Sequence, residues 1–568
     1  MDQLAPDLGH PVELRVLTGP NLYFARPAVK LTLDASGVLG AEPADVVGWQ
    51  RALRVRNPTV GLPDSPARAN AAAELAAAVV RRAAGTIATR VAAVARPGDD
   101  HTVVAAFPFR HRGTAELFGE AVARAFASIT QYGIDPVVAL GEIPAALAGH
   151  DPGETVRPLR PNIPVIAVTG TNGKTTTTRL IAHLIKAGGR VPGWSSTDGI
   201  VIDGEVVETG DWSGPGGAAR VLEDQRVQVA VTETARGGIL LRGVGTATND
   251  VSVVTNISED HLGLLGVHTV EQLAEVKSVV VRITKPNGWT VLNADDPLVR
   301  EMRMVSRARP WFYSPDPENP YLDEALEAGG RAITVVDGQM VVLGRGHDPT
   351  LVMPVAQVPL TLAGASRVNV ANALAATAAA LAVGVPLEAV RAGLASFTSG
   401  AQHNSGRLNV YVLDGAAIVL DLAHNEASLA SLLEVADALR QPGGALAVVV
   451  GTAGDRTDEA IYAMGAMAAT AADRVVVAGR IKYLRGRDPG EMEEIWRAGA
   501  AQAGVIEAEE TPNELSALVL LLDAQLPGGS AIAVCALEQR QEMAEELVRR
   551  GGREMTATEV AERVAACS

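Results

Sequence analysis

The chain has 568 residues, of which 49 are Lys or Arg and 65 are Asp or Glu, so its formal net charge is −16. This acidic surplus disfavours nonspecific binding to nucleic acid or anionic membranes, and the 47% apolar content excludes a disordered chain. At roughly 150 residues per domain, the length suggests three or four domains.

The first 160 residues are predicted to form an α+β domain followed by a linker. They lack a glycine-rich phosphate loop, and residues 150–164 have the polar, proline-rich composition of a linker. Alternating and helical apolar spacings predict strands at 12–17, 28–33 and 102–107 and helices at 68–84 and 114–129.

From residue 161 onwards, strands alternate with helices, which predicts mostly parallel sheets covered on both faces. A turn-rich stretch at 397–406 separates a central domain, 161–398, from a Rossmann-like α/β domain, 399–568. The predicted central elements are strands 165–169, 227–232 and 251–257 and helix 175–187; the predicted C-terminal strands are 417–422, 445–450, 474–478 and 530–535.

The cysteine content and the distribution of apolar residues indicate the cellular compartment of the protein. The two cysteines, Cys535 and Cys567, are too few for a disulfide framework or a zinc cluster. The first residues lack the basic and apolar regions of a secretory signal, and no apolar run is long enough to span a bilayer. We therefore expect a cytoplasmic protein.

A phosphate-binding loop, TGTNGKTT at 169–176, follows a predicted strand and opens a predicted helix. Gly170 and Gly173 allow backbone N–H groups to turn toward phosphate oxygens, at a helix N-terminus that favours anions. Lys174 supplies a positive charge for the β- and γ-phosphates, and the Thr175 hydroxyl can bind Mg²⁺. The usual first glycine is replaced by Val168, so the loop is a variant.

This loop resembles that of the Mur ligase superfamily, which joins amino acids to carboxylates using ATP. Further motifs of the family follow in order: TETARGGI with Glu233, NISEDHLG at 256–263, Lys277, VLNADDP at 291–297, RVNVANALAA with Asn369 and Asn372, Gly406-Arg407 and DLAHN at 421–425. Val368, Leu422 and Glu426 depart from the family pattern.

Within the superfamily, the sequence is most similar to the cyanophycin synthetases. The likeness includes TGPNLY at 18–23, DHLG at 260–263 and LRGR at 484–487. Those enzymes insert an ATP-grasp ligase domain where this chain runs from its linker directly into the phosphate loop. The resemblance therefore implies half of a two-reaction enzyme, with a separate ATP-grasp ligase as a partner.

The resemblance also implies the cofactors and the catalytic residues. ATP would be used with two Mg²⁺ ions, and Lys174, Glu233, His261 and Lys277 would be catalytic. Thr175, Glu233, His261 and a carbamylated Lys277 would bind the metal. The competing interpretations are an exposed glutamate, a turn-capping histidine and a solvated helix lysine.

ATP would be bound by the loop and by residues near adenine, ribose and phosphate. These residues are Gly170, Thr171, Asn172, Gly173, Lys174, Thr175, Thr176, Asn293, Asp295, Asn372, Arg407, Asp421 and His424. The carboxylate donor would lie near Thr197, Asp198 and Arg236, and the incoming amine near Asp455, Arg456, Arg485 and Arg487. The last two arginines are alternatively part of a plain charged loop.

The leading hypothesis is an ATP-dependent amide ligase that forms an acyl phosphate and releases ADP and phosphate. A folylpolyglutamate-synthase-like glutamate ligase and a non-catalytic ATP-binding scaffold remain as alternatives. We expect small-molecule partners, an amino acid and a carboxylate or peptide acceptor, with no nucleic acid or membrane. We also expect a homo-oligomer.

Overall fold

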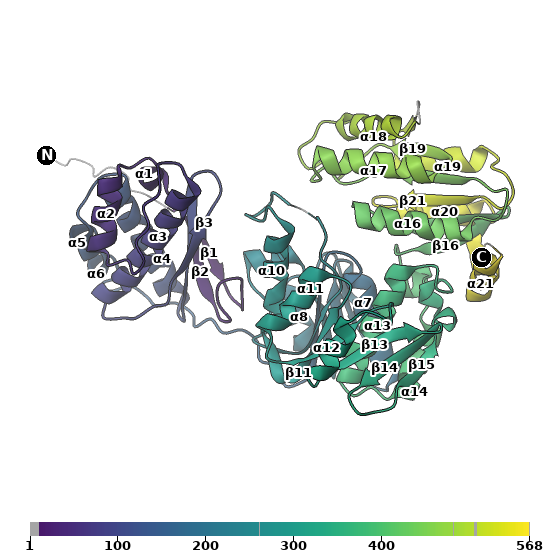
Figure 1. The fold of residues 1–568 in the computed structure, drawn as a ribbon, viewed down its shortest axis with the longest axis horizontal. Coiled ribbons are helices and arrows are strands. Elements are labelled where there is room, and N and C mark those ends of the chain that lie inside the picture. The colour runs from purple at the N-terminus through teal and green to yellow at the C-terminus, as the bar shows by residue number, and fades with distance from the viewer. Residues whose placement is uncertain (1–10, 261, 481, 505–507, 567–568) are drawn as a thin grey trace.

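The computed structural model describes residues 11–260, 262–480, 482–504 and 508–566. Over these residues it contains three sheets, built from residues 13–108, 165–354 and 409–554. Figure 1 shows the three parts of the α/β structure, with the N-terminal part separated from the C-terminal part by the central one. The predicted domain boundaries at 160 and 398 both fall between sheets and stay predictions.

The N-terminal part is a four-stranded antiparallel sheet, in the order β1-β2-β4-β3, among the residues described. Helices α3 (Pro66–Thr86) and α4 (Arg112–Thr130) share one alanine-rich core with β2 and β4. The strands are β1 (Glu13–Leu17), β2 (Ala28–Asp34), β3 (Val94–Pro97) and β4 (Thr102–Pro108), and the short helices are α1 (Ser36–Leu39), α2 (Pro43–Ala52), α5 (Pro136–Gly141) and α6 (Ile143–Ala146).

The central sheet has the order β15-β14-β13-β12-β11-β10-β5-β9-β6-β7-β8. The run from β13 to β6 is parallel, and an antiparallel hairpin extends each edge. The strands are β5 (Val165–Thr169), β6 (Pro192–Ser196), β7 (Gly199–Ile202), β8 (Glu205–Thr209), β9 (Val229–Glu233), β10 (Asn249–Val254), β11 (Thr284–Asn293), β12 (Arg309–Tyr313), β13 (Arg331–Val336), β14 (Gln339–Gly344) and β15 (Thr350–Pro354).

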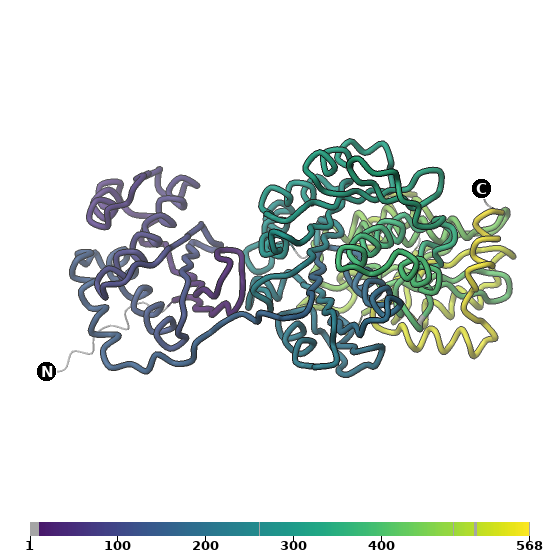
Figure 2. Tube along the Cα trace, turned by 90° about the horizontal axis from the view of Figure 1, so that it is seen from below, coloured from purple at the N-terminus to yellow at the C-terminus, as the bar shows by residue number. Residues whose placement is uncertain are grey.

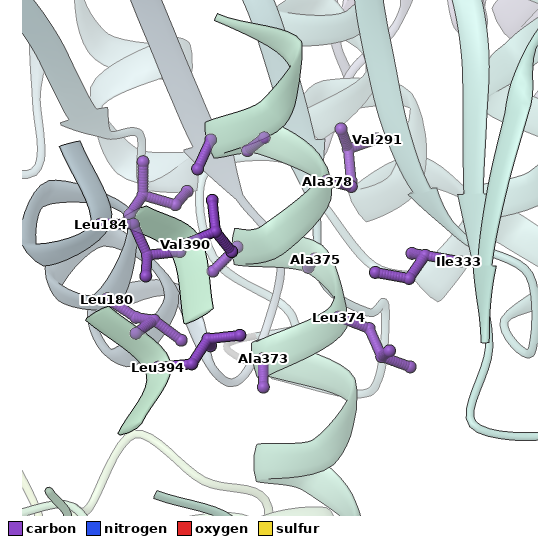
Figure 3. Close-up of a cluster of buried hydrophobic side chains, with 14 of the residues drawn as sticks. Leu180, Leu184, Val291, Ile333, Ala373, Leu374, Ala375, Ala378, Val390 and Leu394 are labelled. Atoms are coloured by element: carbon purple, nitrogen blue, oxygen red, sulfur yellow. The ribbon is translucent and has the colours of Figure 1, made fainter. Parts of the chain in front are cut away.

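Helices cover both faces of this sheet. Helix α13 (Arg367–Ala382) packs between the strands and helices α7 (Lys174–Ala187) and α14 (Leu387–Ser396), and its small Ala373, Ala375 and Ala378 allow the close approach seen in Figure 3. Helices α9 (Arg236–Leu241), α10 (Val270–Arg282), α11 (Pro297–Glu301) and α12 (Tyr321–Glu327) cover the opposite face, and α8 (Pro215–Glu223) packs at the β6 edge.

The C-terminal sheet has the order β20-β19-β18-β21-β17-β16-β22, parallel from β20 to β17. Its strands are β16 (Asn409–Leu413), β17 (Ala416–Asp421), β18 (Leu446–Val450), β19 (Arg474–Ala478), β20 (Glu509–Thr511), β21 (Ala531–Cys535) and β22 (Arg553–Glu554). Its helices are α16 (Glu426–Leu439), α17 (Asp458–Ala471), α18 (Glu491–Gln502), α19 (Glu514–Asp523), α20 (Arg540–Arg549) and α21 (Ala557–Ala565).

The predicted elements agree with this structure to within a few residues. Two details differ. Glu233 is the last residue of β9 rather than the first residue after it, and the turn-rich stretch 397–406 contains a short helix, α15 (Ala401–Asn404). Among the described residues, no helix combines the length and apolarity that crossing a membrane requires.

Candidate active site

A cavity of about 1360 Å³ lies between the carboxyl edge of the central sheet and the C-terminal domain. Parallel strands place their carboxyl ends at one edge, so β5, β9, β10 and β11 all deliver residues to it. Of the predicted site residues it is lined by Thr171, Asn172, Gly173, Lys174, Thr175, Thr176, Thr197, Glu233, Arg236, Lys277, Asn293, Asp295, Asn372, Arg407, Asp421 and His424.

The phosphate loop connects β5 to α7 and needs its two glycines. Gly170 has φ +142° and Gly173 has φ +81°, conformations that side-chain-bearing residues rarely adopt. A Cβ at Gly170 would collide with Thr255, and one at Gly173 with the side-chain oxygen of Asn372. The tight packing of neighbours onto this backbone explains why glycine occupies both positions.

Asn256 holds the loop in shape. Its backbone carbonyl accepts from Thr171 N at 2.8 Å, and its side-chain Oδ1 accepts from Asn172 N at 2.9 Å. The Lys174 ammonium lies over the same loop and donates to Thr171 O at 2.7 Å. The loop is therefore fixed by neighbouring residues, with a lysine at its centre.

Thr175 and Glu233 form the candidate Mg²⁺ site. Thr175 Oγ1 donates to Glu233 Oε2 at 2.9 Å, and Thr197 Oγ1 lies 3.4 Å from Thr175 Oγ1. Glu233 is 1% exposed, and its Oε1 has no hydrogen-bond partner within the described residues. Burial raises the pKa of Glu233, while the nearby Lys174 opposes that rise. A buried carboxylate with a spare oxygen beside a hydroxyl fits a hard divalent cation.

Lys277 approaches the phosphate loop from α10. It is 3% exposed, and its ammonium donates to Gly170 O at 2.6 Å. Burial and the neighbouring Lys174 lower the pKa of Lys277 to about 7. The interpretation as a solvated helix lysine is therefore wrong, and so is that of Glu233 as an exposed glutamate. His261, the third residue of this predicted group, lies outside the described residues.

Asn293, Asp295 and Asn372, which the resemblance would place near adenine, line the same cavity. Asn293 Nδ2 donates to Thr255 O at 2.8 Å, and its Oδ1 accepts from Asp295 N at 3.0 Å. Asn372 accepts from Thr177 Oγ1 at 3.2 Å and thereby connects α13 to α7. These contacts orient the side chains, and their role toward adenine stays a prediction.

The C-terminal domain contributes Arg407, Asp421 and His424 to the cavity. Burial raises the pKa of Asp421 to about 6, against the lowering effect of Arg407, while its Oδ2 accepts from Leu408 N. Burial lowers the pKa of His424 to about 4, so its ring is neutral at pH 7. Both groups pack where β17 ends and α16 begins.

Three polar contacts connect the two domains beside the cavity. Asn172 and Asn425 exchange hydrogen bonds of 3.2 and 3.1 Å through their side-chain amides. The buried Arg456 pairs with Asp260 at 2.8 Å and donates to His424 O at 3.0 Å. Asp198 pairs with Arg179 at 2.8 Å and lies 3.7 Å from Arg540 of α20.

The predicted substrate residues are not all brought together. Thr197 and Arg236 line the main cavity, whereas Asp455 and Arg456 line an adjoining one of about 430 Å³. Arg487 is bound to Asp458, Glu491 and two carbonyl groups, and the Arg485 guanidinium lies over the Tyr483 ring. Neither of these two arginines lines a described cavity, so their substrate role stays a prediction.

Sequence reasoning missed several residues in and near the cavity wall. Asn256 was visible at the end of a predicted strand, and this position could have identified it. Arg179 of helix α7 lies outside the cavity lining; it is largely buried and pairs with the predicted site residue Asp198, and its position in the helix did not predict this contact. A glycine-rich segment, 211–217, which ends in the first turn of α8, also lines the cavity together with Thr197, and only the tertiary structure places it there.

Comparison with known proteins gives concordant matches. The family described as "Mur ligase middle domain" matches residues 168–380, and "Mur ligase, glutamate ligase domain" matches 406–536. A cyanophycin synthetase from Synechocystis is 41% identical over 340 residues, which are 60% of this chain and 38% of that protein. This chain thus spans 38% of the length of that relative.

Two further relatives are covered more fully. A UDP-N-acetylmuramyl-tripeptide synthetase from Deinococcus radiodurans is 31% identical over 64% of this chain and 70% of that protein. The solved structure of E. coli FolC in complex with DHPP and ADP has a TM-score of 0.50 at 19% identity, covering 69% of this chain and 90% of FolC, and shares the fold. The chain belongs to the Mur ligase family.

Proposed function

We propose that this chain is an ATP-dependent amide ligase, similar to the cyanophycin synthetases, that joins an amino acid to a carboxylate. The observation that carries this proposal is the convergence of the phosphate loop, Glu233 and Lys277 in one cavity between two domains. The matches to a cyanophycin synthetase and to a muramyl-tripeptide synthetase support the same class of reaction.

The reaction has two steps. A carboxylate oxygen attacks the γ-phosphorus of ATP and ADP leaves, which gives an acyl phosphate. The amine nitrogen then attacks the acyl carbon, phosphate leaves, and the nitrogen loses a proton. Both steps spread negative charge over phosphate oxygens, so preorganised cationic groups and backbone donors lower the barrier.

Different residues of the cavity would bind the phosphates, the metal ion and the two substrates. Lys174 and the loop N–H groups would bind the phosphates, and Arg407 would approach them from the C-terminal domain. Thr175 and Glu233 would hold Mg²⁺, which supplies charge neutralisation between the phosphates when bound. Thr197, Asp198 and Arg236 would orient the carboxylate donor, and the amine would approach from the side of Asp455 and Arg456.

A second Mg²⁺ and carbamylation of Lys277 belong to the same proposal. Addition of CO₂ requires a neutral amine, and the pKa of about 7 gives Lys277 a substantial neutral fraction at pH 7. A carbamylated Lys277 and His261 would then hold the second ion. Removal of bicarbonate should lower the rate of wild type, and bicarbonate should not affect Lys277→Ala.

The experiment is a substrate screen with the purified full chain. Twenty amino acids are each offered with ATP, Mg²⁺ and either aspartyl peptides or a folate, with phosphate release and product mass as readouts. We expect phosphate release that needs both an amino acid and an aspartyl acceptor. Release with glutamate and folate would favour the glutamate ligase instead, and equal release without any acceptor would contradict a ligase.

The partners remain part of the proposal. A cyanophycin-synthetase-like ligase that makes one of two alternating bonds requires a second ligase, which we propose to be a separate ATP-grasp protein. Adding such a protein and its amino acid should convert single additions into chain growth. We also propose a homo-oligomer, which sedimentation of the purified chain would test.

A further inference from the structure

The loop Thr18–Phe24 between β1 and β2, here called the docking loop, is organised by one buried side chain. Asn21 is fully buried; its Nδ2 donates to Gly19 O at 2.9 Å and Arg26 O at 3.0 Å. Its Oδ1 accepts from Tyr23 N and Phe24 N, both at 3.0 Å. Four bonds from one amide fix the shape of this loop without a ligand.

The docking loop binds the turn that follows α9. Thr18 N donates to Arg242 O at 2.8 Å, and Val244 N donates to Pro20 O at 2.7 Å. The two backbones approach so closely that a Cβ at Gly19 would collide with Val244 O. Gly243, with φ +88°, faces Gly19 across this contact. Figure 2 shows the loop side by side with the central domain.

The same loop and its neighbours bind α10. Leu22 packs against the apolar cluster to which α10 contributes Val279, and the Arg282 guanidinium donates to Asn21 O. Arg96 of β3 forms a two-pronged ion pair with Glu275, at 3.0 and 3.1 Å. Figure 1 shows the β1–β2 end of the N-terminal domain facing α10.

These contacts lie on the opposite side of α10 from the cavity. Leu273 and Lys277, four residues apart, share the face that lines the cavity. Glu275 and Arg282, two turns apart, share a face about 140–180° away and point to the N-terminal domain. Helix α9 connects the two more closely, because Arg236, Gly238 and Arg242 line the cavity and the Arg242 carbonyl oxygen also accepts from the docking loop.

From this arrangement we infer that the docking loop is a positioning element for the cavity and that Asn21 is its principal positioning residue. It holds the C-terminal end of α9 and the side of α10 that faces away from the cavity, and through these helices it positions Arg236 and Lys277. The N-terminal domain, which has no chemistry of its own in the proposed reaction, thereby contributes to the rate. The catalytic part of this inference rests on the proposed ligase function.

The first test compares Asn21→Ala with wild type in the full chain. We expect kcat for phosphate release to fall about tenfold, because small displacements of reacting groups are costly, while the KM for ATP changes less than twofold. Amide hydrogen exchange should accelerate in α9 and α10 and remain unchanged in α7. Wild-type kcat and exchange in a folded Asn21→Ala protein would overturn the inference.

A second test reverses the charges of one ion pair, so that the inference can be tested even if Asn21→Ala does not fold. Arg96→Glu and Glu275→Arg should each lower kcat about threefold and loosen α10, and the double variant should recover both, because the pair is restored in reverse. Arg112→Glu is the matched control, since its partners Glu116 and Glu154 both precede the central sheet. Failure of the double variant to restore α10 exchange would also overturn the inference.

The exchange measurement separates this inference from the proposed function. If wild type releases no phosphate with any substrate, the ligase proposal fails, but the exchange of α9 and α10 still decides the positioning role. If wild type is an active ligase and Asn21→Ala is equally active with unchanged exchange, only the positioning role fails.

Discussion

The two ends of the cavity are built in different ways. At the phosphate end, Glu233 and Lys277 come from one domain and contact the phosphate loop directly, Glu233 at Thr175 and Lys277 at Gly170. At the end toward the C-terminal domain, the cavity depends on contacts between domains, such as Arg456 with Asp260. The first end is preorganised by one sheet, whereas the geometry of the second is set by how the domains sit together.

The largest expected effect concerns the phosphate end. Lys174→Ala should lower ligase activity by about 10³-fold, because it removes a preorganised cation from the developing phosphate charge. Phosphate release with the preferred substrate pair measures this. Lys186→Ala, an exposed lysine on the same helix paired with Asp203, is the control and should leave the rate unchanged. Equal losses in both variants would show that α7 as a whole, rather than Lys174, matters.

The next effect separates activity from stability. Glu233→Gln should lower activity about 100-fold and raise the Mg²⁺ concentration needed for half-maximal rate, because a neutral amide binds a hard cation weakly. The same change should leave the melting temperature unchanged or higher, since it removes a buried charge. Thermal unfolding measures the melting temperature, and a large decrease for Glu233→Gln would contradict this account of Glu233.

A smaller effect is expected between the domains. Arg456→Ala should lower kcat about tenfold, because it removes the buried ion pair with Asp260 that joins the two domains, and so lowers the population of the assembled cavity. Small-angle scattering with ATP should show a more extended molecule. Arg497→Ala, whose partner Glu510 lies within the C-terminal domain, is the control. An unchanged rate and shape would show that this pair does not hold the domains together.

The smallest effect concerns pH. Burial raises the pKa of Asp421 to about 6 from 3.8, so this group makes the folded state less stable as pH rises from about 4 to 6. Burial lowers the pKa of His424 from 6.5 to about 4, so its contribution has the opposite sign: stability is lost as pH falls from 6.5 to 4. The two contributions oppose each other in the wild-type protein.

Single substitutions should reveal how each group changes the unfolding free energy with pH. Relative to wild type, Asp421→Asn should show unfolding free energy that rises more steeply between pH 4 and 6, by about 1 kcal/mol per pH unit. For His424→Gln, the unfolding free energy should rise less steeply with pH than in wild type over the same range. Denaturant unfolding at several pH values measures both, and parallel curves for all three proteins would contradict these pKa shifts.

Much of the fold and of the phosphate end could be predicted from the sequence. The loop 169–176 is contiguous, and Glu233 and Asn256 lie at or just after the ends of the buried strands β9 and β10, so the order of strands along the chain predicts where they meet. The other end could not be predicted in this way. The pair of Arg487 with Glu491, four residues later, is local, but the pair of Arg487 with Asp458 depends on packing between separate segments, which no local pattern predicts. The burial of Arg179 depends on the C-terminal domain for the same reason.

The two hydrogen bonds between Asn172 and Asn425 have a consequence for how the phosphate loop is connected to the C-terminal domain. Asn425 also caps α16, accepting from Ser428 N, so one amide connects the phosphate loop to a helix dipole in the other domain. Amides carry no charge and do not titrate. This contact therefore keeps its strength across salt and pH conditions that weaken ion pairs. A ligand that displaced Asn172 would also change the hydrogen bonding of Asn425 at the N-terminus of α16.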